Sequence, residues 1–276
     1  MKDRLTRAAR EVLPPFLASW LKRLRGTELR FEDCPLDWSW ACARSSGYDQ
    51  PEILVRVAAA TREVVAGRST YERDSVLFHR PDYRFPVVTA LLHEAVISGG
   101  RLNVIDFGGS LGSAYWQSRP FLSAVPRVDW RVVEQPHYVS LGRREFANEH
   151  LTFHSSIADA SADLDQGLAL LCCVLQFLPD PREILRQISR STVTHLLIDR
   201  TPMSQSDGIR LAIQHTPKLI YPASYPQWIF PVDELLSWLA PTWRLIAEID
   251  CPEGRRRTES GFEFEFRGLY LERVAR

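Results

Sequence analysis

A glycine-dense turn directly after an apolar run is the feature that most restricts how this chain can fold. Residues 102–116 read LNVIDFGGSLGSAYW, so an apolar run ends at Asp106 and Gly108, Gly109 and Gly112 follow. Glycine permits positive φ and close approach of a ligand, and the N–H groups at the start of a helix attract anions. The segment therefore predicts a buried strand that passes through a nucleotide-binding turn into a helix, with spacing looser than the dinucleotide fingerprint.

A second apolar run strengthens this interpretation. Residues 130–136, WRVVEQP, contain Glu134 at the end of the run. In nucleoside-binding folds an acidic residue at the tip of the second strand holds the ribose hydroxyls. We therefore expect Glu134 to accept hydrogen bonds from a ribose.

From residue 102 onward, apolar strands alternate with amphipathic helices. The predicted strands are 102–107, 130–135, 151–154, 168–175 and 195–199, and the predicted helices are 112–123, 137–149 and 180–190. Continuous apolar strands separated by helices indicate a parallel sheet covered on both faces. The last two strands, 243–250 and 261–274, are predicted to form an antiparallel pair at the sheet edge, with Arg255 to Arg257 in a solvated loop between them.

The first third of the chain predicts helices, at 51–67 and 85–100, and no strand. We expect a helical N-terminal cap over residues 1–84 and a sheet-containing domain over 85–276. Residues 1–25 carry seven Lys or Arg around an apolar stretch. This pattern fits either weak peripheral contact with an anionic membrane or a helix packed on the main domain, and the break at Pro14 and Pro15 favours the second.

Composition restricts the class of protein. The 276 residues include 34 Lys and Arg and 34 Asp and Glu, so the formal net charge is zero and no overall positive field favours nucleic acid. The five cysteines form no Cys-x-x-Cys pair, and no apolar run is long enough to predict a membrane span or a signal peptide. We expect a cytoplasmic protein without a metal site or disulfide framework.

Three segments resemble the class I S-adenosylmethionine-dependent methyltransferases. DFGGSLG is similar to their Asp/Glu-x-Gly-x-Gly-x-Gly loop, with Ser110 in place of the middle glycine. VVEQPHYV is similar to an Asp-Leu-Pro-His-Val segment of small-molecule O-methyltransferases, and CVLQFLPDPREIL resembles a fourth-strand Leu-His-His-Leu-Pro-Asp-Pro segment. Together with IDRTP, SSGYDQPEIL and YERDSVLF, they make the chain from about Phe31 onward resemble methyltransferases encoded beside bacterial surface-polysaccharide genes.

The resemblance implies a fold, a cofactor and an acceptor. The fold would be a Rossmann-like α/β methyltransferase sheet, mostly parallel, with an antiparallel C-terminal hairpin and a helical N-terminal cap. The cofactor would be S-adenosyl-L-methionine, bound by the domain over residues 85–276, and the acceptor a saccharide hydroxyl or another cell-envelope metabolite. The residues implied for cofactor binding are Asp106, Gly108, Gly109, Ser110, Gly112, Glu134, Gln135, Ser155, Ser156, Val174 and Gln176.

Besides Ser110, two further positions depart from the family pattern. Ser155 or Ser156 follows the third strand, where the superfamily often has an acidic residue that contacts the adenine amine. A serine hydroxyl can still accept one hydrogen bond there. The histidine base of many O-methyltransferases aligns with Gln176, whose amide takes no proton at neutral pH.

Other residues are therefore candidates for the base that would take a proton from the acceptor. Asp199 ends the fifth strand at the carboxyl edge, where ligands bind in open α/β sheets, although Arg200 beside it is an alternative ion-pair partner. His215 and Tyr225 belong to the stretch 200–230, which we predict to be a long loop whose aromatic residues suit a sugar ring. Packing of these rings onto the cap is the alternative.

Three other functions remain open. GGSLG also matches the Gly-x-Ser-x-Gly nucleophile elbow of a serine hydrolase, with Ser110, Asp199 and His215 in the chain order of a triad. No strand is predicted before residue 102 and no His-Gly-Gly segment is present, and both facts disfavour it. A nicotinamide dehydrogenase requires a tighter glycine spacing. A non-catalytic cofactor-binding scaffold in polysaccharide assembly would be compatible with the departures at Ser110 and Gln176.

Overall fold

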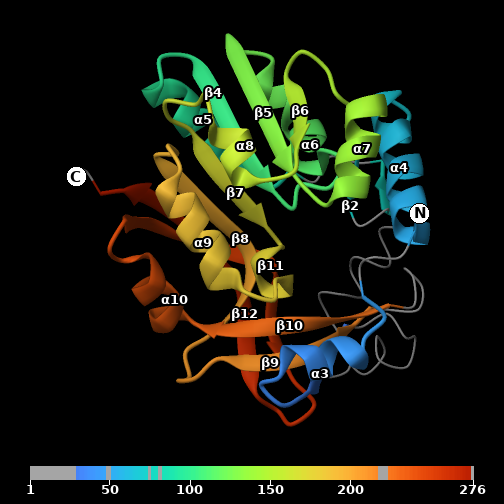
Figure 1. Ribbon diagram of the computed structural model, residues 1–276, viewed down its shortest axis with the longest axis vertical. Helices are drawn as coiled ribbons and strands as arrows, with labels where there is room; N and C mark the ends of the chain where they lie inside the picture. The colour runs from blue at the N-terminus through green and yellow to red at the C-terminus, as the bar shows by residue number, and fades with distance from the viewer. Residues whose placement is uncertain (1–28, 48–50, 74–75, 80–82, 217–222, 275–276) are drawn as a thin grey trace, which may run out of the picture. The chain divides into compact units, whose positions relative to one another are not determined.

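The computed structural model describes residues 29–47, 51–73, 76–79, 83–216 and 223–274 (Figure 1). The chain forms two compact units. The first comprises 1–48, 211–227 and 257–262, and the second comprises 49–210, 228–256 and 263–276. The basic segment 1–25 and Tyr221 lie outside the described residues. The boundary at residue 84 stays a prediction.

The second unit contains a mostly parallel sheet. Its strands are β4 (Arg101–Phe107), β5 (Arg127–Val133), β6 (Leu151–His154), β7 (Leu168–Cys172), β8 (His195–Ser204), β11 (Trp243–Arg257) and β12 (Glu263–Arg273), with the end of β10 (Ser224–Pro231). The order β6-β5-β4-β7-β8 is parallel throughout. β12 runs antiparallel to β8 and pairs with β11, which confirms the predicted sheet with its C-terminal hairpin. Because β4 lies between β5 and β7, the strand order reverses beside it, and ligands of open α/β sheets bind at such a point.

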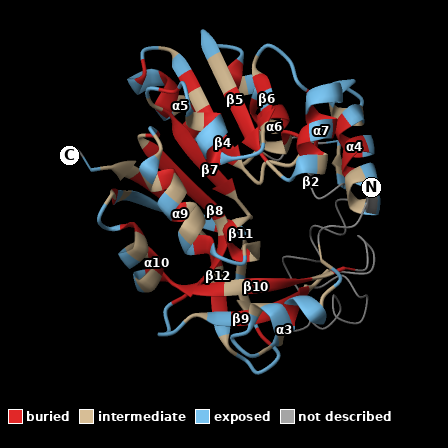
Figure 2. Ribbon diagram, in the orientation of Figure 1, coloured by how far each residue is buried: buried red, intermediate tan, exposed pale blue. Residues whose placement is uncertain are grey.

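Helices cover both faces of this sheet (Figures 1 and 2). The helices are α4 (Pro51–Val65), α5 (Phe85–Ile97), α6 (Ser113–Leu122), α7 (Pro136–Glu145), α8 (Ile157–Ser161), η1 (Leu175–Phe177), α9 (Pro181–Arg190) and α10 (Val232–Leu239). Successive side chains of a strand point to opposite faces. Leu102 and Val104 therefore join a core with α4 to α7, and Ile105 joins a second core with α8, α9 and α10.

The expectation of no strand before residue 102 is wrong. β1 (Arg30–Asp33) lies in the first unit, and β2 (Tyr71–Arg73) pairs antiparallel with β3 (Val76–Phe78) in the second. The rings of Tyr71 and Phe78 stack 4.7 Å apart across that pair. Strands this short carry too little alternation to be detected in sequence, and a cross-strand aromatic pair stabilises them instead.

The predicted long loop and the predicted arginine loop are also wrong. β8 continues to Ser204, and β9 (Arg210–His215) and β10 occupy most of residues 200–230. Arg255 to Arg257 belong to β11. Most residues of β11 are exposed or half-buried, so no apolar pattern in the sequence shows where this strand ends.

The first unit is small and largely extended. β1 runs antiparallel to β9, with Phe31 opposite Gln214, and β9 neighbours β10. Its helix α3 (Trp38–Ala43) is capped at the N-terminus by Asp37, whose carboxylate accepts from the backbone N–H of Trp40 at 3.0 Å. Among the described residues of the whole chain, no helix combines the length and apolar content needed to cross a membrane.

Candidate functional site

The turn between β4 and α6 has the conformation that its glycines predict. Gly108 and Gly112 have φ of +72° and +87°, and Ser110 between them has φ of +56°. A Cβ at Gly109 would lie 2.4 Å from Oδ2 of Asp106, so only glycine fits at that position. The turn therefore lies directly on the end of its own strand.

Glu134 joins the tip of β5 to this turn. Its Oε1 accepts from the backbone N–H of Ser110 at 3.2 Å, and its Oε2 accepts from the N–H of Gln135 at 2.8 Å. The side chain is half-buried, and this burial raises the pKa of Glu134. The N–H groups of Gly109 and Leu111 have no hydrogen-bond acceptor within the described residues. The predicted ribose carboxylate and the predicted loop therefore lie together, and two backbone N–H groups of the loop remain available to a ligand.

Asp106 lies beneath the loop rather than facing a ligand. Its side chain is 1% exposed and accepts from Nε1 of Trp130 at 3.0 Å. Desolvation, with a smaller contribution from the nearby charge of Glu134, raises the pKa of Asp106 to about 7 despite the hydrogen bond from Trp130. This geometry fits a role for Asp106 in shaping the loop, and its place among the cofactor-binding residues stays a prediction.

The residues predicted beside the adenosine occupy the ends of the next helices. Gln135 precedes α7 and is exposed. The hydroxyl of Ser156 caps α8 by accepting from the N–H of Asp159 at 3.0 Å. Ser155 is exposed and lines an open pocket with Pro136 and Val139 of α7. Ser155 is therefore the better placed of the two serines to meet a ligand.

The segment after β7 packs against the loop. A Cβ at Gly108 would lie 2.4 Å from Cγ2 of Val174, so these two elements are in close contact. Cys173 has φ of +58°. Gln176 is completely buried, and its Nε2 donates to Sγ of Cys173 and to the carbonyl of Arg200, both at 3.3 Å. Its Oε1 has no hydrogen-bond partner within the described residues.

Asp199 forms a buried ion pair. Its carboxylate, 0% exposed, accepts from Nη2 of Arg84 at 2.6 Å and from Nε at 2.9 Å. The thiols of Cys172 and Cys251 lie 3.8 and 3.7 Å from its oxygens. The predicted partner Arg200 is wrong, because Arg200 pairs with Glu253. A carboxylate held this way is not accessible to an acceptor, so the predicted role of Asp199 as a base is disfavoured.

His215 and Tyr225 belong to the first unit. Nε2 of His215 lies 3.0 Å from Oε2 of Glu32, and Tyr225 is 1% exposed. Neither residue shows a feature that assigns it to the acceptor, and their roles stay predictions. The geometry also disfavours the hydrolase triad, because Asp199 is 0% exposed and both of its oxygens accept from Arg84 rather than from a histidine.

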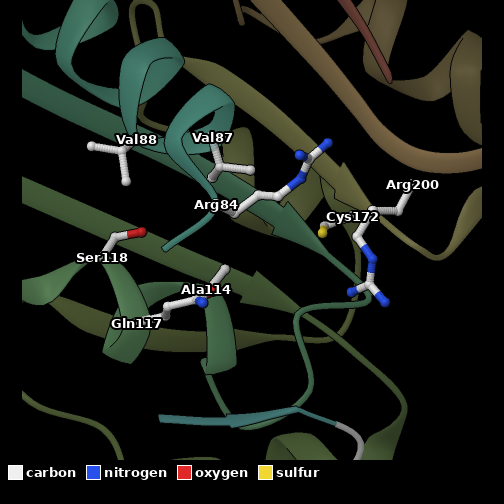
Figure 3. A pocket seen from close by; sticks show the side chains of 8 residues that line it. All are labelled: Arg84, Val87, Val88, Ala114, Gln117, Ser118, Cys172 and Arg200. Carbon is white, nitrogen blue, oxygen red and sulfur yellow. The ribbon is translucent and has the colours of Figure 1, made fainter. Parts of the chain in front are cut away.

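A small pocket at the carboxyl edge contains residues that the sequence did not indicate (Figure 3). It has a volume of about 30 Å³ and is lined by Arg84, Val88, Ser118, Cys172 and Arg200, among others. Arg84 comes from the residue before α5, which is 115 positions from Asp199. No local pattern marks a pairing over that distance.

Comparisons with known proteins give structural likeness and no sequence match. No protein-family model matches the chain, and no curated protein matches it. A Burkholderia thailandensis 1,6-didemethyltoxoflavin-N1-methyltransferase, solved with 1,6-didemethyltoxoflavin and S-adenosylhomocysteine, is 18% identical, with 90% of this chain and 95% of that chain covered and a TM-score of 0.43. The N-terminal domain of EvdMO1, solved with S-adenosylhomocysteine and D-fucose, is 13% identical over 82% and 100%, with a TM-score of 0.45. LepI in complex with S-adenosylmethionine is 14% identical over 86% and 54%, with a TM-score of 0.48. The assignment of the fold therefore rests on the strand order itself.

Proposed function

We propose that this protein is an S-adenosylmethionine-dependent methyltransferase. The observation that carries the proposal is the contact between the carboxylate of Glu134 and the backbone of Ser110 in the glycine turn. It joins the two features that a nucleoside-binding sheet needs, a turn with free backbone donors and an acceptor for ribose hydroxyls, at its topological switch point. The resemblance of the sequence motifs to those of class I methyltransferases indicates that the nucleoside is S-adenosylmethionine.

The chemistry of the donor set fits this cofactor. Gly109 and Leu111 would offer N–H groups to the methionine carboxylate, and Glu134 would accept from the ribose hydroxyls. Ser155 would face the adenine from its pocket beside α7. When bound, the cofactor supplies a methyl group on a positively charged sulfur, which a nucleophile displaces in line.

The chain's own contribution to the reaction is binding and orientation. Gln176 is completely buried and its amide takes no proton at neutral pH, while the carboxylate of Asp199 is held by Arg84. Neither side chain is a general base in this geometry. A proton released by an acceptor hydroxyl would therefore pass to water, and catalysis would depend on alignment of the reacting atoms. A saccharide or another envelope metabolite is the acceptor that we propose from the motif resemblance.

The test is isothermal titration with S-adenosylmethionine and, separately, with NAD. We expect binding of the first only, and we expect Glu134→Ala to weaken it by about 1–3 kcal/mol if a charged hydrogen bond is lost. Glu134→Gln keeps an acceptor for Ser110 and should lose less. Glu145→Ala is the matched control, because it removes an exposed carboxylate from the helix that follows Glu134.

The outcomes separate the alternatives. Absence of S-adenosylmethionine binding would overturn the proposal, and labelling of Ser110 by a fluorophosphonate would restore the hydrolase. Cofactor binding without transfer to any acceptor in an extract of surface polysaccharide precursors would favour the scaffold.

A further inference from the structure

The pocket at the carboxyl edge presents positive charge on its wall. Arg84 and Arg200 both line it, and no acidic side chain does (Figure 3). The carboxylates that pair with them, Asp199 and Glu253, are absent from the lining. The thiols of Cys172 and Cys251 add no negative charge, because burial raises the pKa of each thiol, for Cys251 to about 12.

Arg84 is held rigidly and keeps donors for a ligand. Its Nε and Nη2 donate to Asp199, and its Nη2 also donates to the carbonyl of Asp250 at 3.2 Å. Its Nη1 has no acceptor within the part of the chain that the structure describes. A guanidinium fixed along one edge offers its remaining N–H groups in a defined direction, which suits recognition of a carboxylate.

Arg200 occupies a backbone conformation that is unfavourable for a residue with a side chain. Its φ is +54°, and its Nε donates to Oε1 of Glu253 at 2.7 Å. The carbonyl of Arg200 also accepts from Gln176. Strain of this kind persists where the surroundings hold it, and it is frequent at ligand sites. Here it places a second arginine on the wall of the same pocket as Arg84.

Aromatic rings flank the residues of the pocket. Tyr83 and Phe85 are the chain neighbours of Arg84, and Phe121 lies one turn of α6 after Ser118. The rings of Tyr83 and Phe121 meet edge to face with centroids 4.8 Å apart, and Phe85 is 60% exposed. The pocket is small, at about 30 Å³, so the rest of a ligand whose carboxylate entered it would lie outside.

We propose that Arg84 and Arg200 bind the carboxylate of the methyl acceptor, so that the acceptor of this enzyme is an acidic molecule. This inference rests on the proposed function for the identity of the reaction. The same carboxylate chemistry has a second source, the methionine portion of the cofactor, and the experiment must separate the two.

The first arm measures carboxylate binding without any cofactor. Benzoate is compared with benzamide, and D-glucuronate with D-glucose, by isothermal titration against the wild-type protein. At least one acid should bind about tenfold or more tightly than its neutral counterpart, since charge-assisted hydrogen bonds dominate the difference. Arg200→Gln should remove most of that preference, and Arg200→Lys should keep part of it.

Glu253→Gln is the control that keeps both arginines. It removes the carboxylate that competes for Arg200, so acid binding should stay equal or become tighter. This variant also keeps the test decisive if Arg200→Gln fails to fold, because a loss of acid binding in Glu253→Gln would contradict the proposal.

The second arm separates the two sources of the carboxylate. S-adenosylhomocysteine is compared with S-methyl-5′-thioadenosine, which lacks the amino acid group. We expect Arg200→Gln to change the affinity of neither by more than about twofold. A loss confined to S-adenosylhomocysteine would make this the cofactor's own subsite and overturn the acceptor assignment.

Failure of the inference is distinguishable from failure of the proposed function. Equal binding of acids and neutral counterparts, or acid binding that ignores Arg200, overturns the inference even when the cofactor binds. Failure of both adenosine compounds to bind overturns the methyltransferase assignment, whatever the acids do.

Discussion

The two ends of the sheet in the second unit meet the same backbone requirement with different residues. At the amino end, the left-handed positions before β4 are Gly99 and Gly100. At the carboxyl end Gly108 and Gly112 share the left-handed region with Ser110, Cys173 and Arg200, and these last three are all the non-glycine residues with positive φ in the part of the chain that is described. Each such residue costs about 1 kcal/mol relative to glycine. The carboxyl end therefore retains side chains against local conformational preference, as expected of the end that binds ligands.

The two ends also differ in how they tie α5 to β8. At the carboxyl end Arg84 precedes α5 and pairs with Asp199. At the amino end Nδ1 of His195 lies 2.7 Å from Oε2 of Glu94, in the last turn of α5. Arginine stays charged when its partner is lost, whereas histidine has a neutral form available near pH 7. Loss of one partner should therefore lower the stability of the protein more at the Arg84–Asp199 pair than at the Glu94–His195 pair.

The largest expected effect is that of Asp199→Ala. The substitution leaves the charge of Arg84 in a poorly solvated place, and removing one member of a buried pair typically lowers the free energy of unfolding by about 3–5 kcal/mol. Urea denaturation measures the loss. Glu145→Ala, which breaks the exposed pair with Arg62, should change stability little. Equal losses in the two variants would remove the distinction between the pairs.

The next effect concerns pH at the carboxyl end. The pKa of Asp106 is about 7 in the folded protein and ordinarily 3.8, so the folded state binds the extra proton. Stability should therefore fall as pH rises from about 4 to about 7 and level off above that, by up to about 4 kcal/mol. Asp106→Asn keeps an acceptor for Trp130 and should abolish this fall, which thermal unfolding across pH 4 to 8 would show. If the stability of Asp106→Asn fell with pH as much as that of the wild type, Asp106 would not be the group responsible.

A smaller effect is expected at the amino end. Glu94→Gln keeps an oxygen for the hydroxyl of Ser98, which donates to Glu94 at 2.9 Å, and removes the carboxylate beside His195. We expect a loss of about 1–2 kcal/mol in the free energy of unfolding and unchanged cofactor affinity. A loss as large as that of Asp199→Ala would show that the two ends are not different in the way we infer.

The smallest effect compares backbone positions. Gly99→Ala has room for its Cβ but must keep φ near +63°, so it should lose about 1 kcal/mol. Ser110→Gly relieves strain but makes the unfolded chain more flexible, so its stability should change by less than about 1 kcal/mol. Its S-adenosylmethionine affinity should fall because the turn is less fixed. Differential scanning calorimetry and titration together test this contrast.

The sequence predicts the sheet well and its surroundings poorly. β4 to β8 are recognisable because strands buried on both faces are continuous apolar runs. The sequence does not indicate the extensions of β8 beyond residue 199 and of β11 beyond residue 250, because polar or turn-forming residues stand where each extension begins. Pairing with other strands keeps these residues extended. The hairpin of β2 and β3 has only three residues in each strand.

For the candidate site, the sequence indicates the positions that follow a strand. Glu134 and the glycine turn are found from spacing alone. Arg84 could not be found, because its partner is 115 residues away and no periodicity links them. The burial of Asp106 and Asp199 was likewise hidden, since a carboxylate after a strand looks the same in sequence whether it faces a ligand or lies beneath the backbone.

The contact between Trp130 and Asp106 gives the protein an internal optical probe. The indole Nε1 donates to a carboxyl group that changes its ionisation close to neutral pH, in a place completely shielded from water. Indole emission responds to a charge at that distance. The difference between the fluorescence spectra of the wild type and Asp106→Asn therefore reports the proton on Asp106 in the native state, and so reports events at the glycine turn without any attached label.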